Sequence, residues 1–397
     1  MVSPIVGEAF GQERVMRDSA RLLEADGHQV FFLGERALGS PPPKTLLVNG
    51  LSTLNRFTPP AKVRQIENDV LDFAAATQPD VVHFMEQLDP RILNAVSNRY
   101  PAVLTAHTVA PTCPASGRVT ATGACQAKSG WSCLVGHKSQ ACLSHFKNDF
   151  YRAHAIYEYQ RKRLATKRLN FVLANSRYTE QLLRHDGWAA SRVRFVPNPV
   201  FVPREMRRER SQHPLLVTTS RLHPLKGIGT LLDALAELKD QRWQLWICGD
   251  GPERKRLEEK SAAYALNDRV RFLGQVAYDK AGEIVAKATV LLQPNVGPET
   301  FGLSVAEASS RGIPVLTSNV PALNEIIVDG VNGFLCPPGD RSMLRERLLR
   351  VLQTPGLQRL FAENGPRLMR ERFSPAAHLE ATLSVYRQCT DVLADAA

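Results

Sequence analysis

Two successive series of apolar runs and amphipathic stretches constrain the fold of this 397-residue chain more than any other feature of its sequence. Short apolar runs are typical of buried parallel strands, and the amphipathic stretches between them are typical of helices that cover a sheet. The pattern predicts an α/β protein with two doubly wound, Rossmann-like domains. Such domains bind ligands at the carboxyl ends of their strands, so we expect a central ligand cleft.

The first series predicts strands at residues 28–33, 44–48, 80–85, 103–107, 171–174 and 194–197, with helices at 12–25, 61–77, 90–99, 149–168 and 176–185. A basic segment with two prolines, 201–214, reads as a linker. The second series predicts strands at 215–220, 243–248, 270–273, 290–293 and 315–317, with helices at 227–238, 253–264 and from 303. We therefore expect one domain at 1–200, a second at 201–375 and a final helical segment at 376–397.

The start of the chain leaves little room for a first strand, because only residues 1–6 precede the loop from Gly7 to Gly11. We expect either a very short strand or a gene start further upstream. No basic region followed by an apolar run marks a signal peptide, so the expected location is the cytoplasm. The uncharged stretch 100–117 contains three prolines and does not read as a membrane span.

The formal net charge of +11 suits an anionic partner. No nucleic-acid-binding motif accompanies the charge, so we expect no nucleic acid. Nucleotide sugars and anionic lipid headgroups both fit, and a basic surface that only aids solubility is the simple alternative.

The segment from Glu299 to Glu307 has the sharpest pattern for chemistry. A predicted strand ends before it, and a helix is expected to open at Phe301 and Gly302. Free amides near Leu303 at that helix start suit a phosphate, and the two carboxylates can accept hydrogen bonds from sugar hydroxyls. The alternative is an ordinary strand, loop and helix with two exposed acids.

Two cations, Arg221 and Lys226, lie on the loop after the first strand of the second series, directly before Gly227. Cations at this edge of a parallel sheet can neutralise a diphosphate. Diphosphate is the leaving group when a nucleotide sugar reacts, and stabilising its growing charge is a large catalytic contribution. Taken alone, the pair is also consistent with two solvated cations.

Together these segments resemble the family-4, or group 1, glycosyltransferases of the GT-B fold. The matching segments stand in the order of the family and begin at Arg221, Gly249, Arg271, Glu299, Gly312 and Asp329. The resemblance implies that Arg221 and Lys226 clamp the diphosphate, that Glu307 holds the ribose, and that Glu299 contacts the donor sugar. The amides near Phe301, Gly302 and Leu303 would serve the phosphate and the sugar.

The N-terminal half resembles the family more loosely. Gly11 stands where the family has a glycine-rich loop, which implies that its amide approaches the distal phosphate. His107 matches a strand end of the family and would lie beside the donor sugar. Without the resemblance, its place at a predicted strand end favours a satisfied structural histidine. The final helix of the family crosses back onto the first domain, and residues 376–394 are placed to do so.

The resemblance implies a retaining hexosyltransferase that uses a UDP- or GDP-sugar and a glycan, lipid-linked or small-molecule acceptor, as in polysaccharide biosynthesis. No carboxylate stands out as a nucleophile and no Asp-x-Asp motif is present, so we expect same-face displacement without a metal or further cofactor. The alternatives are a sugar-nucleotide epimerase of the same fold and a non-catalytic carbohydrate-binding protein.

Two features lie in or beside an insertion at 108–146, which we expect to shape the acceptor site. The cysteines at 113, 125, 133 and 142 are a possible zinc site, or else reduced thiols. The helix after them, within 147–168, has seven Lys or Arg against two acids, with aromatic residues interleaved. It is expected either to rest on anionic membrane lipid or to be an ordinary amphipathic surface helix.

Overall fold

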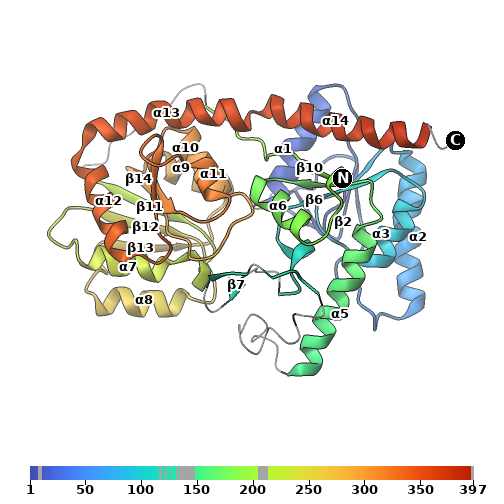
Figure 1. Cartoon of the computed structure of the whole chain (residues 1–397), viewed down its shortest axis with the longest axis horizontal. Helices are drawn as coiled ribbons and strands as arrows, with labels where there is room; N and C mark the ends of the chain where they lie inside the picture. The colour runs from blue at the N-terminus through green and yellow to red at the C-terminus, as the bar shows by residue number, and fades with distance from the viewer. Residues whose placement is uncertain are drawn as a thin grey trace. The chain divides into compact units, whose positions relative to one another are not determined.

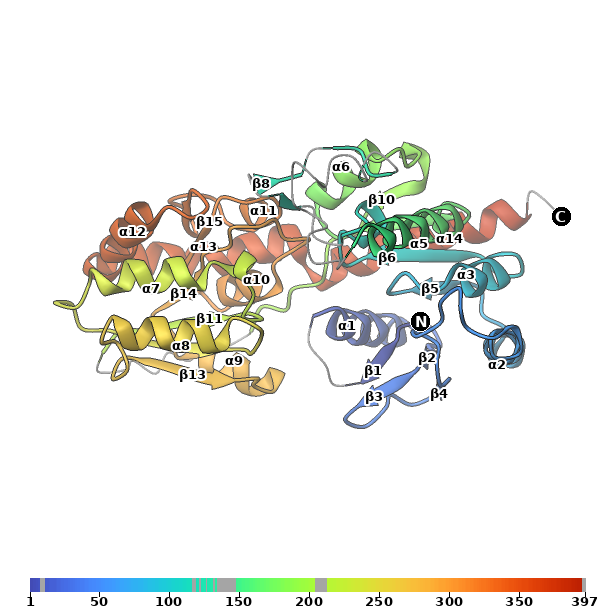
Figure 2. The ribbon, with the colours of Figure 1, turned by 90° about the horizontal axis from the view of Figure 1, so that it is seen from below.

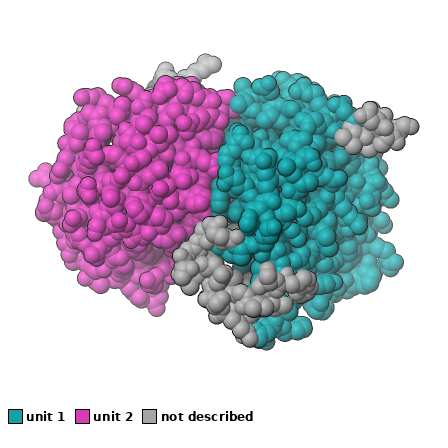
Figure 3. All heavy atoms as spheres, in the orientation of Figure 1, with its two compact units in different colours: residues 1–199, 375–397 teal, residues 200–374 magenta. Residues whose placement is uncertain are grey.

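The computed structural model describes residues 1–7, 11–115, 119–120, 123–125, 127–130, 133, 148–203 and 213–394. The chain divides into two compact units, coloured separately in Figure 3. Unit 1 comprises residues 1–199 and 375–397, and unit 2 comprises residues 200–374. Among the described residues, no helix combines the length and the hydropathy that crossing a membrane requires.

Unit 1 is built on parallel strands in the order β10-β9-β6-β5. A bridge through Val2 links β5 to β2, which pairs with β4, while β1 pairs separately with β3. The strands are β1 (Ile5–Gly7), β2 (Phe32–Gly34), β3 (Arg36–Leu38), β4 (Thr45–Leu47), β5 (Val82–Phe84), β6 (Ala102–Ala106), β9 (Phe171–Ala174) and β10 (Val193–Phe195), with a short antiparallel pair, β7 (Val119–Thr120) and β8 (Gly123–Ala124).

The helices of unit 1 cover this sheet through separate apolar clusters. They are α1 (Gln12–Ala25), α2 (Pro60–Thr77), α3 (Pro90–Ser97), α5 (Asp149–Thr166), α6 (Arg177–His185) and α14 (Pro375–Ala394), with short 3-10 turns η1 (Ala110–Thr112) and η2 (Ala190–Arg192). Helices α2 and α3 share one cluster with the strands. Helix α14 packs on α1 in a second cluster and on β6 and β9 in a third. The last helix is therefore part of unit 1, although 175 residues of unit 2 precede it.

Unit 2 has a six-stranded parallel sheet in the order β13-β12-β11-β14-β15-β16. Its strands are β11 (Leu215–Thr219), β12 (Gln244–Cys248), β13 (Val270–Gly274), β14 (Val290–Gln293), β15 (Val315–Ser318) and β16 (Gly333–Cys336). Its helices are α7 (Ile228–Ala236), α8 (Arg254–Ala263), α9 (Tyr278–Ala286), α10 (Leu303–Ser310), α11 (Leu323–Ile326), α12 (Arg341–Gln353) and α13 (Pro355–Phe373), with the turn η3 (Pro224–Lys226).

Alternate residues of the unit 2 strands enter two different cores. Leu216 and Leu245 join the cluster formed with α7, α8 and α12. Leu215 and Val217 join the cluster formed with α9, α10, α11 and the end of α13. Figures 1 and 2 show helices on both faces of this sheet, as the sequence predicts for a doubly wound domain.

The α/β class is confirmed, and most predicted elements occur within a few residues of their expected bounds. The predicted strand at 28–33 is misplaced, because pairing begins only at Phe32, where Thr45 lies opposite. The loop before Gly11 does follow a very short strand, β1, whose partner β3 the sequence did not predict. Helix α10 begins at Leu303, as predicted for the second series, and Gly302, one of the two residues expected to open it, adopts a left-handed conformation as its N-cap.

Candidate functional site

Two predicted site segments of unit 2 follow neighbouring strands. Strand β11 leads to the turn with Lys226, and strand β14 beside it leads to the loop with Glu299. The amides of Val296 and Gly297 both donate to the carbonyl oxygen of Leu225, at 2.9 and 3.2 Å. The carboxyl edge of the sheet therefore fixes the two segments against each other.

Gly227 makes this close approach possible. Its φ is 66°, a left-handed conformation that favours glycine, and a Cβ atom there would lie 1.9 Å from the carbonyl oxygen of Pro294. No side chain fits between the turn and the loop. The glycine after Lys226 thus has a structural reason as well as a place in the motif.

Lys226 and Glu299 form a direct ion pair between Nζ and Oε1. The same oxygen accepts a hydrogen bond of 2.6 Å from Nδ2 of Asn295, whose Oδ1 accepts one of 3.2 Å from Gln293. Asn295 and Gln293 are buried, so this polar chain holds the carboxylate in one orientation. No sequence motif singles out Asn295, although its place two residues after a predicted strand is a signal for a residue at the sheet edge.

The other predicted residues of unit 2 lie on the same two segments. Arg221 is exposed two residues after β11, and Glu307 lies within α10, the helix that follows Glu299. No ion pair of Arg221 occurs in the described part of the chain. The structure brings Lys226 and Glu299 into contact and places Arg221 and Glu307 on the elements around them.

The start of α10 combines a buried aromatic side chain with the first backbone amides of a helix. The ring of Phe301 is buried and meets that of Phe373 edge to face at 5.4 Å, so its side chain is structural. Gly302 has a φ of 98°, and a Cβ there would lie 2.3 Å from Cδ2 of Leu323. The first amides of a helix have no acceptor within it, which leaves that of Leu303 available to an anion, whereas the amide of Ala306 already donates to the carbonyl oxygen of Gly302.

Unit 1 contains a pocket of about 310 Å³ at the carboxyl ends of β5 and β6. His107, the residue after β6, lines it. Polar side chains from α1, the end of β5 and α5 share the lining: Gln12, Glu86, Gln87, Glu158, Tyr159 and Lys162. The sequence singles out His107 but none of these six, because they come from three segments far apart in the chain.

Burial of His107 lowers the pKa of its imidazole to about 3, and nearby His378 acts in the same direction. The ring is therefore neutral near pH 7. It can donate or accept a hydrogen bond with a ligand, but it supplies no positive charge. His83, one strand away, has a different role. Its two nitrogens bond to Tyr386 of α14 and to Thr105, both at 2.7 Å, so it ties the last helix to the sheet.

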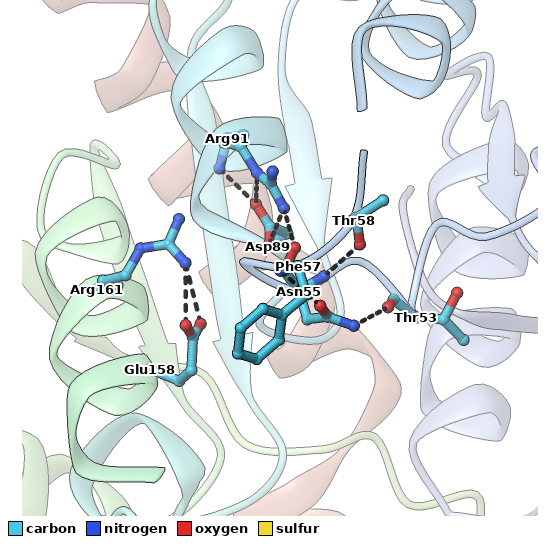
Figure 4. A network of polar contacts seen from close by, with 8 residues as sticks. All are labelled: Thr53, Asn55, Phe57, Thr58, Asp89, Arg91, Glu158 and Arg161. Carbon is cyan, nitrogen blue, oxygen red and sulfur yellow. Dashed lines mark hydrogen bonds and ion pairs between the residues drawn. The ribbon is translucent and has the colours of Figure 1, made fainter. Parts of the chain in front are cut away.

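Most polar groups of the pocket are held by neighbours. Gln12 donates to Glu86 at 2.9 Å, and Gln87 donates to Thr166 at 2.7 Å. Glu158 accepts two bonds of 3.1 Å from Arg161, as Figure 4 shows. The remaining acceptor positions of these side chains can receive hydrogen bonds from a ligand that presents hydroxyl groups.

Gly11 has a φ of 69° and is the N-cap of α1, directly before Gln12 of the pocket. A Cβ at Gly11 would meet nothing within 4 Å, so its backbone conformation and not close packing favours glycine. Residues 8–10 of the predicted loop lie outside the described residues, and the expected phosphate contact of Gly11 stays a prediction.

The zinc prediction also stays open. Cys142 lies outside the described residues, while Cys113 is buried and lines the pocket. In the described part of the chain, no group of three or more His, Cys, Asp or Glu side chains is arranged to hold a metal ion.

Comparison with protein families gives two matches that together run from residue 10 to residue 368. Residues 10–202 match the model of Glycosyltransferase Family 4, and residues 203–368 match that of Glycosyl transferases group 1. The boundary between them lies near that between units 1 and 2.

Curated relatives match over part of their length. A phosphatidyl-myo-inositol mannosyltransferase from Mycobacterium leprae is 36% identical over 151 residues, which cover 37% of this chain and 39% of the relative. An alpha-D-kanosaminyltransferase from Streptomyces kanamyceticus is 27% identical over 177 residues, which cover 44% of this chain and 46% of the relative. The alignments thus span less than half of these relatives.

Solved structures match over nearly the whole chain. A sucrose-phosphate synthase from Thermosynechococcus elongatus superposes with a TM-score of 0.74 at 20% identity, covering 98% of this chain and 96% of that one. Anabaena HepE, solved with UDP and glucose, gives 0.68 at 18% identity, covering 98% and 99%. These likenesses confirm the expected GT-B fold. With both family models matched in order, the chain belongs to the group 1 glycosyltransferases of family 4.

Proposed function

We propose that this glycosyltransferase moves a hexose-type sugar, with retention of configuration, from a UDP- or GDP-sugar to a glycan, lipid-linked or small-molecule acceptor. Unit 2 takes the donor and unit 1 takes the acceptor. The contact between Lys226 and Glu299 carries the proposal, because it sets a cation for phosphate beside a carboxylate for sugar hydroxyls. The complex of HepE with UDP and glucose supports a nucleotide donor for this fold.

The roles in unit 2 follow from charge and position. Arg221 and Lys226, with the first amides of α10 near Phe301, Gly302 and Leu303, neutralise the diphosphate as the bond to the sugar breaks. Glu299 orients the sugar and Glu307 holds the ribose hydroxyls. These groups supply the positive charge that the departing diphosphate requires, so the proposed reaction needs no metal ion and no cofactor besides the donor.

In the proposed same-face reaction, the departing phosphate accepts the proton of the acceptor hydroxyl as that oxygen attacks. The neutral ring of His107 hydrogen-bonds to the donor sugar, and Gly11 lies near the distal phosphate. Neither residue is required to change its charge, which agrees with the strongly lowered pKa of His107.

The exposed face of α5 supports peripheral contact with anionic membrane lipid, from the cytoplasmic side. Phe150, Tyr157 and Leu164 are seven residues apart and are 62%, 41% and 64% exposed. That spacing places them on one face of the helix. Phe57, 69% exposed, points from its loop toward α5 in Figure 4 and lies 5.8 Å from His154 between ring centroids.

Cations accompany these apolar groups. The guanidinium of Arg56 lies 4.6 Å from the ring centre of Phe57 and 5.8 Å from that of Tyr157. Arg91 holds the loop by donating to the carbonyl oxygen of Asn55 at 2.8 Å while paired with Asp89. Apolar rings beside cations suit an interface of acyl chains and anionic headgroups.

Sedimentation with vesicles tests the membrane contact. The chain should bind vesicles that contain phosphatidylglycerol and not vesicles of phosphatidylcholine alone. Phe57→Ser with Leu164→Ser should weaken binding about tenfold, the effect of losing about 1.4 kcal/mol of apolar burial. Leu360→Ser, an exposed leucine of unit 2, is the matched control. Equal binding by all three proteins would favour an ordinary amphipathic surface helix.

A thermal-shift screen with UDP, GDP, ADP, CMP and their sugar conjugates tests the donor site. One nucleoside diphosphate should stabilise the chain selectively. Arg221→Ala should weaken that binding, whereas Glu299→Gln should remove transfer and leave nucleotide affinity largely intact. Unchanged affinity in Arg221→Ala contradicts the clamp, and an equal loss of affinity and transfer in Glu299→Gln contradicts its assignment to the sugar. Turnover of the donor with no acceptor would instead indicate an epimerase.

A further inference from the structure

Among the cations of α5, Lys162 is distinguished by its place in the pocket of unit 1. It lines the pocket and is half-buried, and in the described part of the chain its Nζ has no hydrogen-bond or ion-pair partner. A cation without a partner that is partly removed from water suits an anionic ligand.

The neighbouring cations are already engaged within unit 1. Arg152 pairs with Asp149 at 2.7 Å, and Arg161 pairs with Glu158 at 3.1 Å. Arg163 lies 3.5 Å from Asp186, and Lys167 donates to the carbonyl oxygen of Gly187 at 2.8 Å. Thus the basic stretch 161–163 leaves one uncommitted positive charge, and that charge lies in the pocket.

Helix geometry explains why Lys162 alone is selected. Positions three, four and seven residues apart share a face, so Ala155, Glu158, Tyr159 and Lys162 all line the pocket. Arg161 and Arg163 are rotated about 100° to either side and contact other groups. The hydroxyl of Tyr159 donates to buried Asp186 at 2.7 Å, which fixes this face of the helix.

The rest of the lining suits hydroxyl groups. Glu86 receives its only described side-chain bond from Gln12, at Oε2, and Gln87 uses its amide nitrogen on Thr166, which leaves acceptor oxygens in both side chains. The volume of about 310 Å³ is at the lower end of the range for ligand sites, about 300–1,000 Å³, and suits one sugar-sized ring with a substituent.

We propose that this pocket binds a polyhydroxylated acceptor head group that carries an acidic group, and that Lys162 binds the phosphate or carboxylate of that group. The inference rests on the proposed function, since it names the class of acceptor that unit 1 takes. Lys162 then determines acceptor specificity, and Glu86 and Gln87 bind hydroxyls.

Calorimetric titration of the full chain tests the proposal. The probes are glucose 6-phosphate, glucose 1-phosphate and glucuronate, compared with glucose and with inorganic phosphate. A saturating nucleoside diphosphate is present throughout to occupy the cations of unit 2. At least one acidic sugar should bind at least tenfold more tightly than both glucose and phosphate. The proposal would be overturned if glucose bound as tightly as every acidic sugar, or if inorganic phosphate alone bound as tightly as every acidic sugar.

Three variants assign the preference to a residue. Lys162→Gln should remove the tenfold preference, and Lys162→Arg should retain most of it because the charge remains. Arg168→Gln, at an exposed position just beyond α5, is the matched loss of charge and should change nothing. Preference that survives in Lys162→Gln would overturn the role of Lys162.

Nucleotide binding is measured on the same samples to separate the two proposals. If the wild-type chain binds no nucleoside diphosphate, the proposed function fails. If it binds one and shows no preference that depends on Lys162, the acceptor assignment alone fails.

Discussion

The two units form their candidate sites in different ways. In unit 2 the residues lie on two short segments that follow adjacent strands, and backbone bonds from Val296 and Gly297 to Leu225 join them. In unit 1 the pocket takes residues from α1, two strand ends, η1 and α5. The first site depends on local chain geometry at one sheet edge, and the second depends on packing between distant segments.

The two sites should therefore respond to different perturbations. A close backbone contact at Gly227 supports the unit 2 site, so adding one atom should damage it. Buried neutral histidines support unit 1, since His83 and His378 join α14 to the strands and to Ser19. Unit 1 should therefore be the more sensitive to acid.

The largest effect is expected for Gly227→Ala. The new Cβ would lie 1.9 Å from a carbonyl oxygen at a φ of 66°, which should lower the free energy of unfolding of unit 2 by about 2–5 kcal/mol. Denaturant unfolding measures the loss, and nucleotide binding should fall with it. Gly356→Ala in α13 is the control, because a Cβ there meets nothing and alanine favours a helix. Similar stability of the two variants would contradict the close contact.

The second largest effect is expected from acid, which should destabilise unit 1 more than unit 2. Burial lowers the pKa of His83, His107 and His378, so at mildly acidic pH the unfolded chain binds protons that the folded chain does not. The stabilisation from these neutral histidines is fully present above the ordinary histidine pKa of 6.5 and is lost as the pH falls below that value. The free energy of unfolding of unit 1 should drop by about 3 kcal/mol between pH 7 and pH 5.5.

Hydrogen exchange, corrected for the intrinsic effect of pH, measures this loss separately in β6 and in β11. In unit 2, the described histidines His213 and His223 are only partly buried, so its stability should change less. His378→Gln should reduce the slope of unit 1, because it removes one of the three buried histidines that resist protonation in the folded chain. Parallel losses in both units would show that the histidines are not the cause.

Asn295→Ala should have the smallest effect and should act on catalysis. It removes the 2.6 Å bond to Glu299, and a hydrogen bond to a charged group contributes about 1.5–3 kcal/mol. Because Asn295 positions Glu299, the substitution should lower kcat about tenfold or more, while the Kd of the nucleotide should change little. Asn324→Ala, which breaks an exposed bond to Asn319 in the same unit, is the control. A fall in nucleotide affinity equal to that in kcat would indicate general damage to unit 2.

Much of the fold could be predicted because hydrophobic periodicity is a local signal. Helix α1 and strand β9 have the predicted bounds. Strand β3 was missed because only its pairing with β1 distinguishes three residues as a strand. Short elements depend on partners that a single stretch of sequence does not show.

The sequence alone determined the two-domain α/β class and the residues of the unit 2 motifs, because both follow from periodicity and from spacing along a few residues. The folded chain was needed to show that Lys226 contacts Glu299, that Asn295 holds that carboxylate, and that Lys162 and Glu86 line one pocket. These contacts depend on strand order and helix packing. Both bring together side chains that are far apart along the chain.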